Sequence, residues 1–168
     1  ADGPNAVVTI TTATGLGTAE NRVETNISTL AASVTGTGNI NIDQTNAIDL
    51  VSVTTANGSI TVDSGGTLTA TDVNSSTTDD DAHDIRLTTT AGDIAVVSIN
   101  AGSAGDVTLI ANEAITKDGD PTTVLTADRL TANAGGAITL GTVVASAVLE
   151  TSAAGAIDID QATAIDLV

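Results

Sequence analysis

A short alternating pattern of apolar and polar residues recurs along this chain of 168 residues. Each occurrence reads glycine, a small or polar residue, an aliphatic residue, a variable residue and a second aliphatic residue. The occurrences are GNINI (38–42), GSITV (58–62), HDIRL (83–87, with His for Gly), GDIAV (92–96), GDVTL (105–109), GAITL (136–140) and GAIDI (155–159). Successive residues of a β-strand face opposite sides, so both aliphatic residues share one side. The residue between them is polar in six of the seven cases, which predicts strands that are apolar on one side only.

The spacing of these patterns predicts how the strands stack. Their starts are separated by similar intervals, from 38 to 58, from 83 to 105 and from 136 to 155. A unit of this length is too short to bury its own apolar side, whereas units stacked at roughly 4.8 Å bury a continuous aliphatic column. We therefore predict an all-β fold in which residues 1–168 form one right-handed parallel β-helix, or β-solenoid, with about 19–22 residues per turn.

Two steps in the series are irregular, a short one from 92 to 105 and a long one from 105 to 136. We interpret the first as two patterns on different faces of the same turn and the second as an inserted loop. Further strands are predicted at LVSV (50–53), TLTAT (67–71) and VVSI (96–99), which gives two or three short strands per turn.

The apolar residues are Ala, Val, Leu and Ile alone, because the chain contains no Phe, Trp, Tyr, Met or Cys. A tandem immunoglobulin-like β-sandwich is the main alternative fold, and it would also explain closely spaced strands. That fold usually relies on aromatic side chains for much of its buried area. The composition and the repeat length therefore favour the solenoid.

A longer repeat is superimposed on the short one. The sequences DQTNAIDLV (43–51) and DQATAIDLV (160–168) agree at seven of nine positions, at an offset of 117 positions. The same offset places Pro121 on Pro4 and Val124 on Val7. We predict that residues 52–168 form one 117-residue unit and that residues 1–51 are the end of a preceding unit, with an acidic loop inserted at 74–84.

The formal net charge is −17, from 21 acidic residues and four basic ones. This balance argues against partners that are nucleic acids, because few cations are present to neutralise phosphates, and against anionic membrane surfaces. No apolar run is long enough for a transmembrane helix, so membrane insertion is not expected. A strong negative charge would keep an extracellular protein soluble and could attract divalent cations.

Two acidic segments are candidate calcium sites, and calcium is the only cofactor that the sequence suggests. The first, TTDDDAHD, contains Asp79, Asp80, Asp81 and Asp84, with His83 as an additional ligand for a transition metal; the second, KDGDP, contains Asp118 and Asp120. Neither spacing matches an EF-hand loop or a calcium-binding β-roll. The structural alternative is a solvated loop at the first segment and a turn at the second.

Catalysis is not expected. Parallel β-helices include polysaccharide-degrading enzymes, and the paired carboxylates that glycoside hydrolysis needs are plentiful here. However, the chain has no aromatic residue to stack on a sugar, and its single histidine has no neighbouring Ser or Cys nucleophile. A carbohydrate-binding or polysaccharide-degrading β-helix domain is the alternative function.

The segments TGLGTAENRVETNISTLAAS (14–33) and ITKDGDPTTVLTADRLTANAGGAITL (115–140) resemble the repeats of filamentous-haemagglutinin-like bacterial surface proteins. The shared features are a TGxG start, an SxLxA strand and a GxIxI strand. The resemblance implies an exported β-helix located outside the cell or on its surface, as part of an adhesin or a fibre. The expected role is a stiff spacer or filament building block. The expected partners are neighbouring repeats, copies of the chain stacked end to end, surface glycans or other cells.

Overall fold

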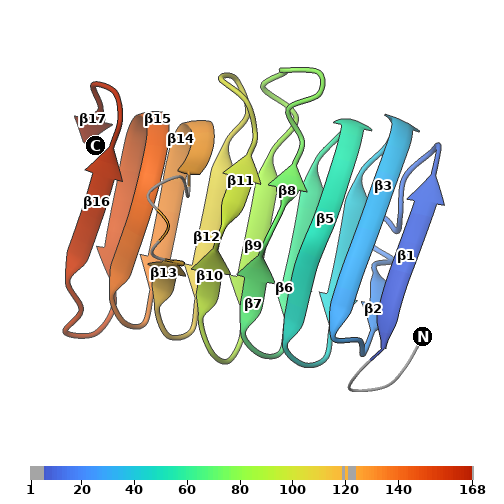
Figure 1. Cartoon of the computed structure of the whole chain (residues 1–168), viewed down its shortest axis with the longest axis horizontal. Helices are drawn as coiled ribbons and strands as arrows, with labels where there is room; N and C mark the ends of the chain where they lie inside the picture. The colour runs from blue at the N-terminus through green and yellow to red at the C-terminus, as the bar shows by residue number, and fades with distance from the viewer. Residues whose placement is uncertain (1–5, 119, 121–123, 168) are drawn as a thin grey trace.

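The computed structural model describes residues 6–118, 120 and 124–167. Strands are the only regular elements in this part of the chain, and they stack in about seven turns of a β-solenoid. The first described strand and the last lie at opposite ends of the stack (Figure 1). Every strand pairing in the described chain is parallel, which confirms the predicted solenoid and excludes a sandwich of antiparallel sheets. No helix able to cross a bilayer is present among the described residues.

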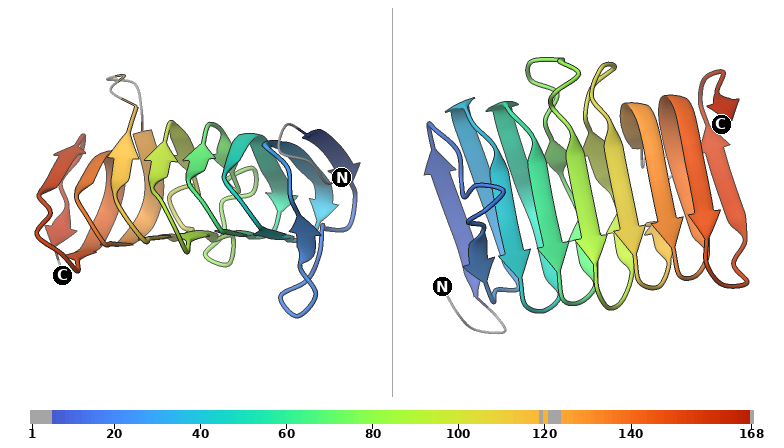
Figure 2. Two further views of the ribbon diagram at one scale, coloured as in Figure 1. Left: turned by 90° about the horizontal axis from the view of Figure 1, so that it is seen from below. Right: turned by 180° about the vertical axis from the view of Figure 1, so that it is seen from behind.

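The strands form three faces, which we number in the order in which the chain meets them from β4 onward. Face 1 contains β2 (Val23–Thr25), β4 (Ile40–Gln44), β6 (Ile60–Ser64), β9 (Ile85–Thr89) and β12 (Val107–Ala111). Faces 2 and 3 share three long strands, β1 (Val7–Thr12), β3 (Thr29–Thr37) and β5 (Ile48–Asn57). Figure 2 shows how the faces enclose the interior along the stack.

Beyond β5, faces 2 and 3 are formed by separate short strands. Face 2 continues through β7 (Leu68–Ala70), β10 (Ile94–Val96) and β13 (Ile115–Lys117), and face 3 through β8 (Val73–Asn74) and β11 (Ser98–Asn100). The long β14 (Val124–Ala134) then runs through faces 3 and 1, and β15 (Ile138–Thr151) runs through faces 2, 3 and 1. The last strands, β16 (Ile157–Gln161) and β17 (Asp166–Leu167), both pair with β15.

Aliphatic side chains in register fill the interior. At one inner position of face 1 the paired residues are Ile40, Ile60, Ile85, Val107, Leu130 and Ala147, all buried. At the corresponding position of face 2 they are Ile48, Leu68, Ile94, Ile115 and Ile138, also buried. Each buried side chain of this size stabilises the fold by about 1.5–3 kcal/mol, so the columns are the main source of stability.

The length of chain between paired residues varies along these columns. The step from Ile60 to Ile85 is longer than the step from Ile40 to Ile60, and the step from Leu130 to Ala147 is shorter than either. The long step contains residues 75–84, the region of the predicted acidic insertion, whereas the equivalent connection in the preceding turn spans only 58–59. Differences in turn length are therefore absorbed by the connections, and the strands keep their register.

The irregular steps of the short pattern have two different explanations. GDIAV (92–96) stacks on face 2, whereas GDVTL (105–109) stacks on face 1, which confirms that these patterns lie on different faces. Most of the interval between 105 and 136 is not a loop, because it contains β13 and β14, which continue the ladders. The predicted insertion is limited to residues 118–123 between these two strands, where the preceding turn has residue 97 alone. Pro4 and Pro121, which support the long repeat, lie outside the described residues.

The predicted alternation holds, with two exceptions that have a local cause. Asn41 is on the outer side of β4 but only 6% exposed, because the segment around Leu16 and Gly17 covers it: the Asn41 backbone donates to Leu16 O at 2.7 Å and Nδ2 donates to Gly17 O at 3.4 Å. Ile157 occupies the inner column of face 2 but is 45% exposed, because it lies in the last turn.

Truncation of a core residue tests this architecture. Ile60→Ala should lower the free energy of unfolding by about 2–5 kcal/mol, because it removes contacts with both Ile40 and Ile85. The outward neighbour Thr61→Ala should cost well under about 1 kcal/mol. Urea denaturation followed by circular dichroism measures both values, and equal losses in the two variants would contradict the inward assignment.

Candidate functional site

His83, the only histidine, anchors the acidic loop to the solenoid. Its side chain is buried, with Nδ1 2.6 Å from Thr78 O and Nε2 2.9 Å from Asn57 Oδ1. The backbone carbonyl of His83 also accepts a hydrogen bond from the Ser75 hydroxyl at 2.6 Å. Nδ1 therefore links two parts of the loop, and Nε2 holds the loop against the end of β5.

Asp79 connects the acidic loop to the loop of the next turn. Its Oδ1 accepts a hydrogen bond from Ala104 N at 2.9 Å, and its Oδ2 accepts one from Ser103 Oγ at 2.5 Å. Gly102, at a φ of 86°, leaves space for this contact, because a Cβ there would collide with Asp79 Oδ1. The Ser103 hydroxyl, followed by the Ala104 amide, lowers the pKa of Asp79. These two protruding loops lie side by side in Figures 1 and 2.

The side chain of Asp84 accepts a type of hydrogen bond that recurs along the stack. Its Oδ1 accepts a hydrogen bond from the backbone of Asp106, the equivalent residue of the next turn, at 3.0 Å. Asp93 does the same for Ala114 at 2.8 Å, and Asn39 for Ser59 at 2.9 Å. Each of these residues directly precedes a strand, where the backbone ladder begins. Carboxylates and amides at this position thus serve as caps that join successive turns.

Asp106 shows the electrostatic consequence of stacking such caps. Partial burial, followed by repulsion from Asp84, raises the pKa of the Asp106 carboxyl, and a hydrogen bond with the Arg129 backbone opposes this effect. Like charges on neighbouring turns therefore destabilise one another, and backbone donors reduce this cost.

The remaining calcium candidates lie in turns. Asp80 Oδ1 accepts a hydrogen bond from Ala82 N at 3.0 Å, and Asp118 Oδ1 accepts one from Asp120 N at 3.0 Å, as in Asx turns. Asp81 and Asp120 are exposed. Within the described residues, no group of three or more histidine or carboxylate side chains is arranged to hold a metal ion. Calcium binding by these six aspartates stays a prediction.

A row of stacked carboxylates at the N-terminal end was not singled out from the sequence. Glu24, Asp43 and Asp63 occupy equivalent outer positions of β2, β4 and β6, and Arg22 forms an ion pair with Asp63. One Asp63 oxygen, Oδ1, is buried without a hydrogen-bond partner. These acids are nearly equally spaced in the sequence, but this spacing identifies a row only once the register between successive turns is known.

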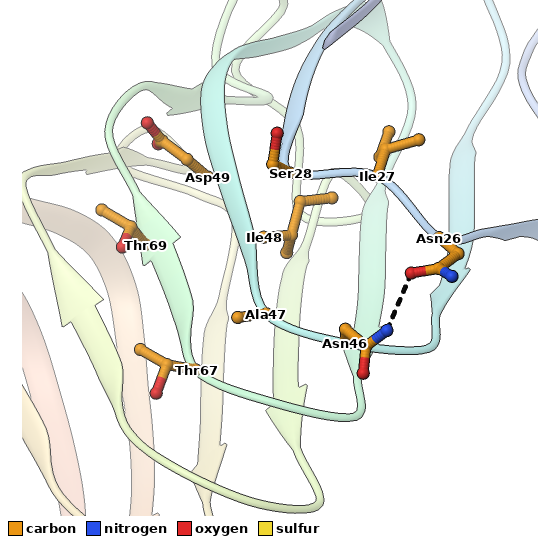
Figure 3. Close-up of a pocket in the computed structure, with 9 residues that line it drawn as sticks. All are labelled: Asn26, Ile27, Ser28, Asn46, Ala47, Ile48, Asp49, Thr67 and Thr69. Atoms are coloured by element: carbon orange, nitrogen blue, oxygen red, sulfur yellow. Dashed lines mark hydrogen bonds between the residues drawn. The ribbon is translucent and has the colours of Figure 1, made fainter. Parts of the chain in front are cut away.

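A groove follows the connections between faces 1 and 2 at the N-terminal end of the stack (Figure 3). It has a volume of about 580 Å³ and crosses three successive turns. Asn46 Nδ2 donates to Asn26 Oδ1 at 2.8 Å, and the single ionisable residue of its lining, Asp49, accepts a hydrogen bond from Thr71 at 2.6 Å. The lining thus offers amides, hydroxyls and methyl groups whose polar atoms already bond from turn to turn, and it presents no paired carboxylates for acid–base chemistry.

The role of Asp79 as a link between the two loops can be tested by pH and by mutation. Because its pKa is lowered in the folded protein, its stabilising contribution is complete above the ordinary value of 3.8 and is lost as the pH falls through the lower folded value. In Asp79→Ala the Ala104 amide should exchange at least tenfold faster at about pH 6, as measured by NMR hydrogen exchange. Asp81→Ala, in the same loop, is the matched control. Unchanged protection of Ala104 in Asp79→Ala would contradict the assignment.

Comparison of the chain with protein-family models, with curated proteins and with solved structures finds no match.

Proposed function

We propose that this chain is a structural repeat segment of a large bacterial surface or secreted protein of the filamentous-haemagglutinin-like kind, and that it acts as a stiff spacer in an adhesin or fibre. The observation that supports this role is the set of aliphatic columns, of which the face 1 column continues in register through six successive turns, from Ile40 to Ala147. Such a stack positions whatever is attached to its two ends at a fixed separation. The proposal assigns no catalytic activity to the chain.

The stiffness follows from the bonding between turns. Each turn contacts only its neighbours, through parallel backbone hydrogen bonds and a shared apolar column. Bending the stack would open hydrogen bonds and expose aliphatic surface on one side. Side-chain caps such as Asp84 to Asp106 and Asp93 to Ala114 add further links at the corners.

The charge and composition support a location outside the cell. A net charge of −17 keeps a long rod soluble, and the absence of cysteine makes the fold independent of the redox state of its surroundings. The partners expected under this proposal are neighbouring repeats or further copies of the chain, with surface glycans bound by other parts of the protein.

Rigidity can be measured directly because the chain has no native cysteine. Spin labels on Ala19→Cys and Ala153→Cys, both exposed and at opposite ends of face 1, should give a single narrow distance distribution. Its centre is expected at roughly 30 Å from the spacing between turns. Double electron–electron resonance provides the measurement, and unfolding in urea provides the broad-distribution control. A broad distribution under native conditions would rule out a stiff spacer.

The location is tested on the bacterium that produces the protein. Antibodies raised against the folded chain should label intact cells or their shed material. Labelling that requires permeabilised cells would contradict the proposal. Electron microscopy of the purified chain separates the two structural roles, since concentration-dependent fibres indicate a filament subunit and single short rods indicate a spacer.

A further inference from the structure

The last turn of the solenoid presents an aliphatic strand edge. In β16, Ile157 is 45% exposed and Ile159 is half-buried, although both occupy inner positions. The corresponding residues of β4, Ile40 and Ile42, are fully buried. The difference arises because β4 is paired on both edges, with β2 and β6, whereas β16 pairs only with β15 among the described strands.

The sequence around β16 repeats that around β4. Residues 38–51 (GNINIDQTNAIDLV) and 155–168 (GAIDIDQATAIDLV) agree at ten of 14 positions, at an offset of 117 positions. Strand β4 pairs with β2, and β16 pairs with β15. In both pairs the partner strand lies the same number of residues earlier in the sequence, since Val23 pairs with Ile42 and Leu140 pairs with Ile159. The two strands therefore have equivalent neighbours on one side.

A glutamine in each strand makes the same contacts with that neighbour. Gln44 Oε1 accepts a hydrogen bond from Thr25 Oγ1 at 2.7 Å, and its Nε2 donates to Ile27 O at 2.7 Å. Gln161 Oε1 accepts one from Thr142 Oγ1 at 2.5 Å, and its Nε2 donates to Val144 O at 2.8 Å. Each residue of the second set follows its equivalent in the first by the offset of the long repeat. The long repeat is thus reproduced in side-chain hydrogen bonds, although β4 lies on face 1 and β16 on face 2.

The opposite edge of β4 shows what such a strand binds. Strand β6 pairs with it in the register Ile40 with Ile60, Ile42 with Val62 and Gln44 with Ser64. Ahead of the strands, Gly58 lies directly against Gly38, where a Cβ on Gly58 would collide with the Gly38 carbonyl oxygen. At this edge a glycine therefore lies two residues before the first inner aliphatic of the bound strand.

We propose that the exposed edge of β16 is a docking surface for a strand with the sequence of β6, supplied by a following copy of the long repeat unit in the same polypeptide. The expected register places Ile60 of that copy on Ile157, Val62 on Ile159 and Gly58 on Gly155. This inference rests on the proposed role as a repeat segment and specifies its partner.

The structure favours this occupant over the N-terminal edge of a separate molecule. That edge is formed by β1, whose first inner aliphatic is Val8. The residue two positions before Val8 is Ala6, whereas β6 has Gly58 at the equivalent position, directly against Gly38. End-to-end stacking of separate copies therefore lacks the fit that the repeat provides.

The test extends the whole chain after Val168 with the sequence of residues 52–74. Hydrogen exchange measured by NMR should show at least tenfold slower exchange of the amides in Ile157–Gln161 that face the added strand. The amides of β4, which are already covered on both edges, should not change and report that the host remains folded. An absence of added protection in β16 would overturn the proposal.

Two control extensions of similar length test the specificity. In the first, the added copies of Ile60 and Val62 are both replaced by Asp, and in the second the added sequence is that of residues 6–28. Neither should protect β16, and equal protection by either would show a non-specific edge and overturn the proposal. Protection of β16 in the original chain that increases with protein concentration would also overturn it, in favour of separate copies.

The distance between the labels at positions 19 and 153 and the labelling of intact cells do not depend on this extension. A failed extension with a narrow distance distribution would refute only the docking inference. A broad distribution would refute the proposed spacer itself.

Discussion

The structure depends on aliphatic residues lying directly above one another in successive turns. Parallel backbone hydrogen bonds hold the turns at a fixed spacing, and an inner column has room only for side chains that stack on their equivalents. Ile40, Ile60 and Ile85 form such a column without a change of residue type. This constraint explains a core built from four aliphatic residue types, because a bulky ring in one turn would need a complementary gap in the next. It also explains why Gly58 must lie against Gly38, where a side chain would collide with the backbone.

The same stacking determines how the chain tolerates its negative charge. Equivalent acids are brought within one turn spacing of each other, and their repulsion is unfavourable, as the raised pKa of Asp106 beside Asp84 indicates. Several acids offset this cost by accepting hydrogen bonds from backbone amides of the next turn, as Asp84 does from Asp106, Asp79 from Ala104 and Asp93 from Ala114. In the described chain these acids therefore act mainly as connectors between turns. A cluster that resembles a metal site in the sequence is dispersed among separate structural contacts.

The long repeat and the turn of the solenoid have different periods. Ile40 and Ile157 are equivalent in the repeat, yet they lie on face 1 and face 2. The hydrogen bonds of Gln44 and Gln161 are nevertheless the same, so the local contacts matter more than the face that carries them. Leu50 and Leu167 are also equivalent, yet they lie on face 2 and face 1. No single rotation between faces therefore relates the two units.

The sequence by itself determined the all-β class, the parallel solenoid and the inward direction of Ile40 and Ile60, because alternation and spacing are properties of neighbouring residues. It also indicated that GDIAV and GDVTL lie on different faces, but only the tertiary structure showed that β13 and β14 fill most of the interval in which an inserted loop was predicted. That assignment depends on the register between turns, which changes with each connection, so that Leu68 and Ile94 are much farther apart in the sequence than Leu130 and Ala147. The partners of individual polar residues follow from that register. Arg22 meets Asp63 and Asp79 meets Ser103 only because the folded turns bring together residues that are 41 and 24 positions apart.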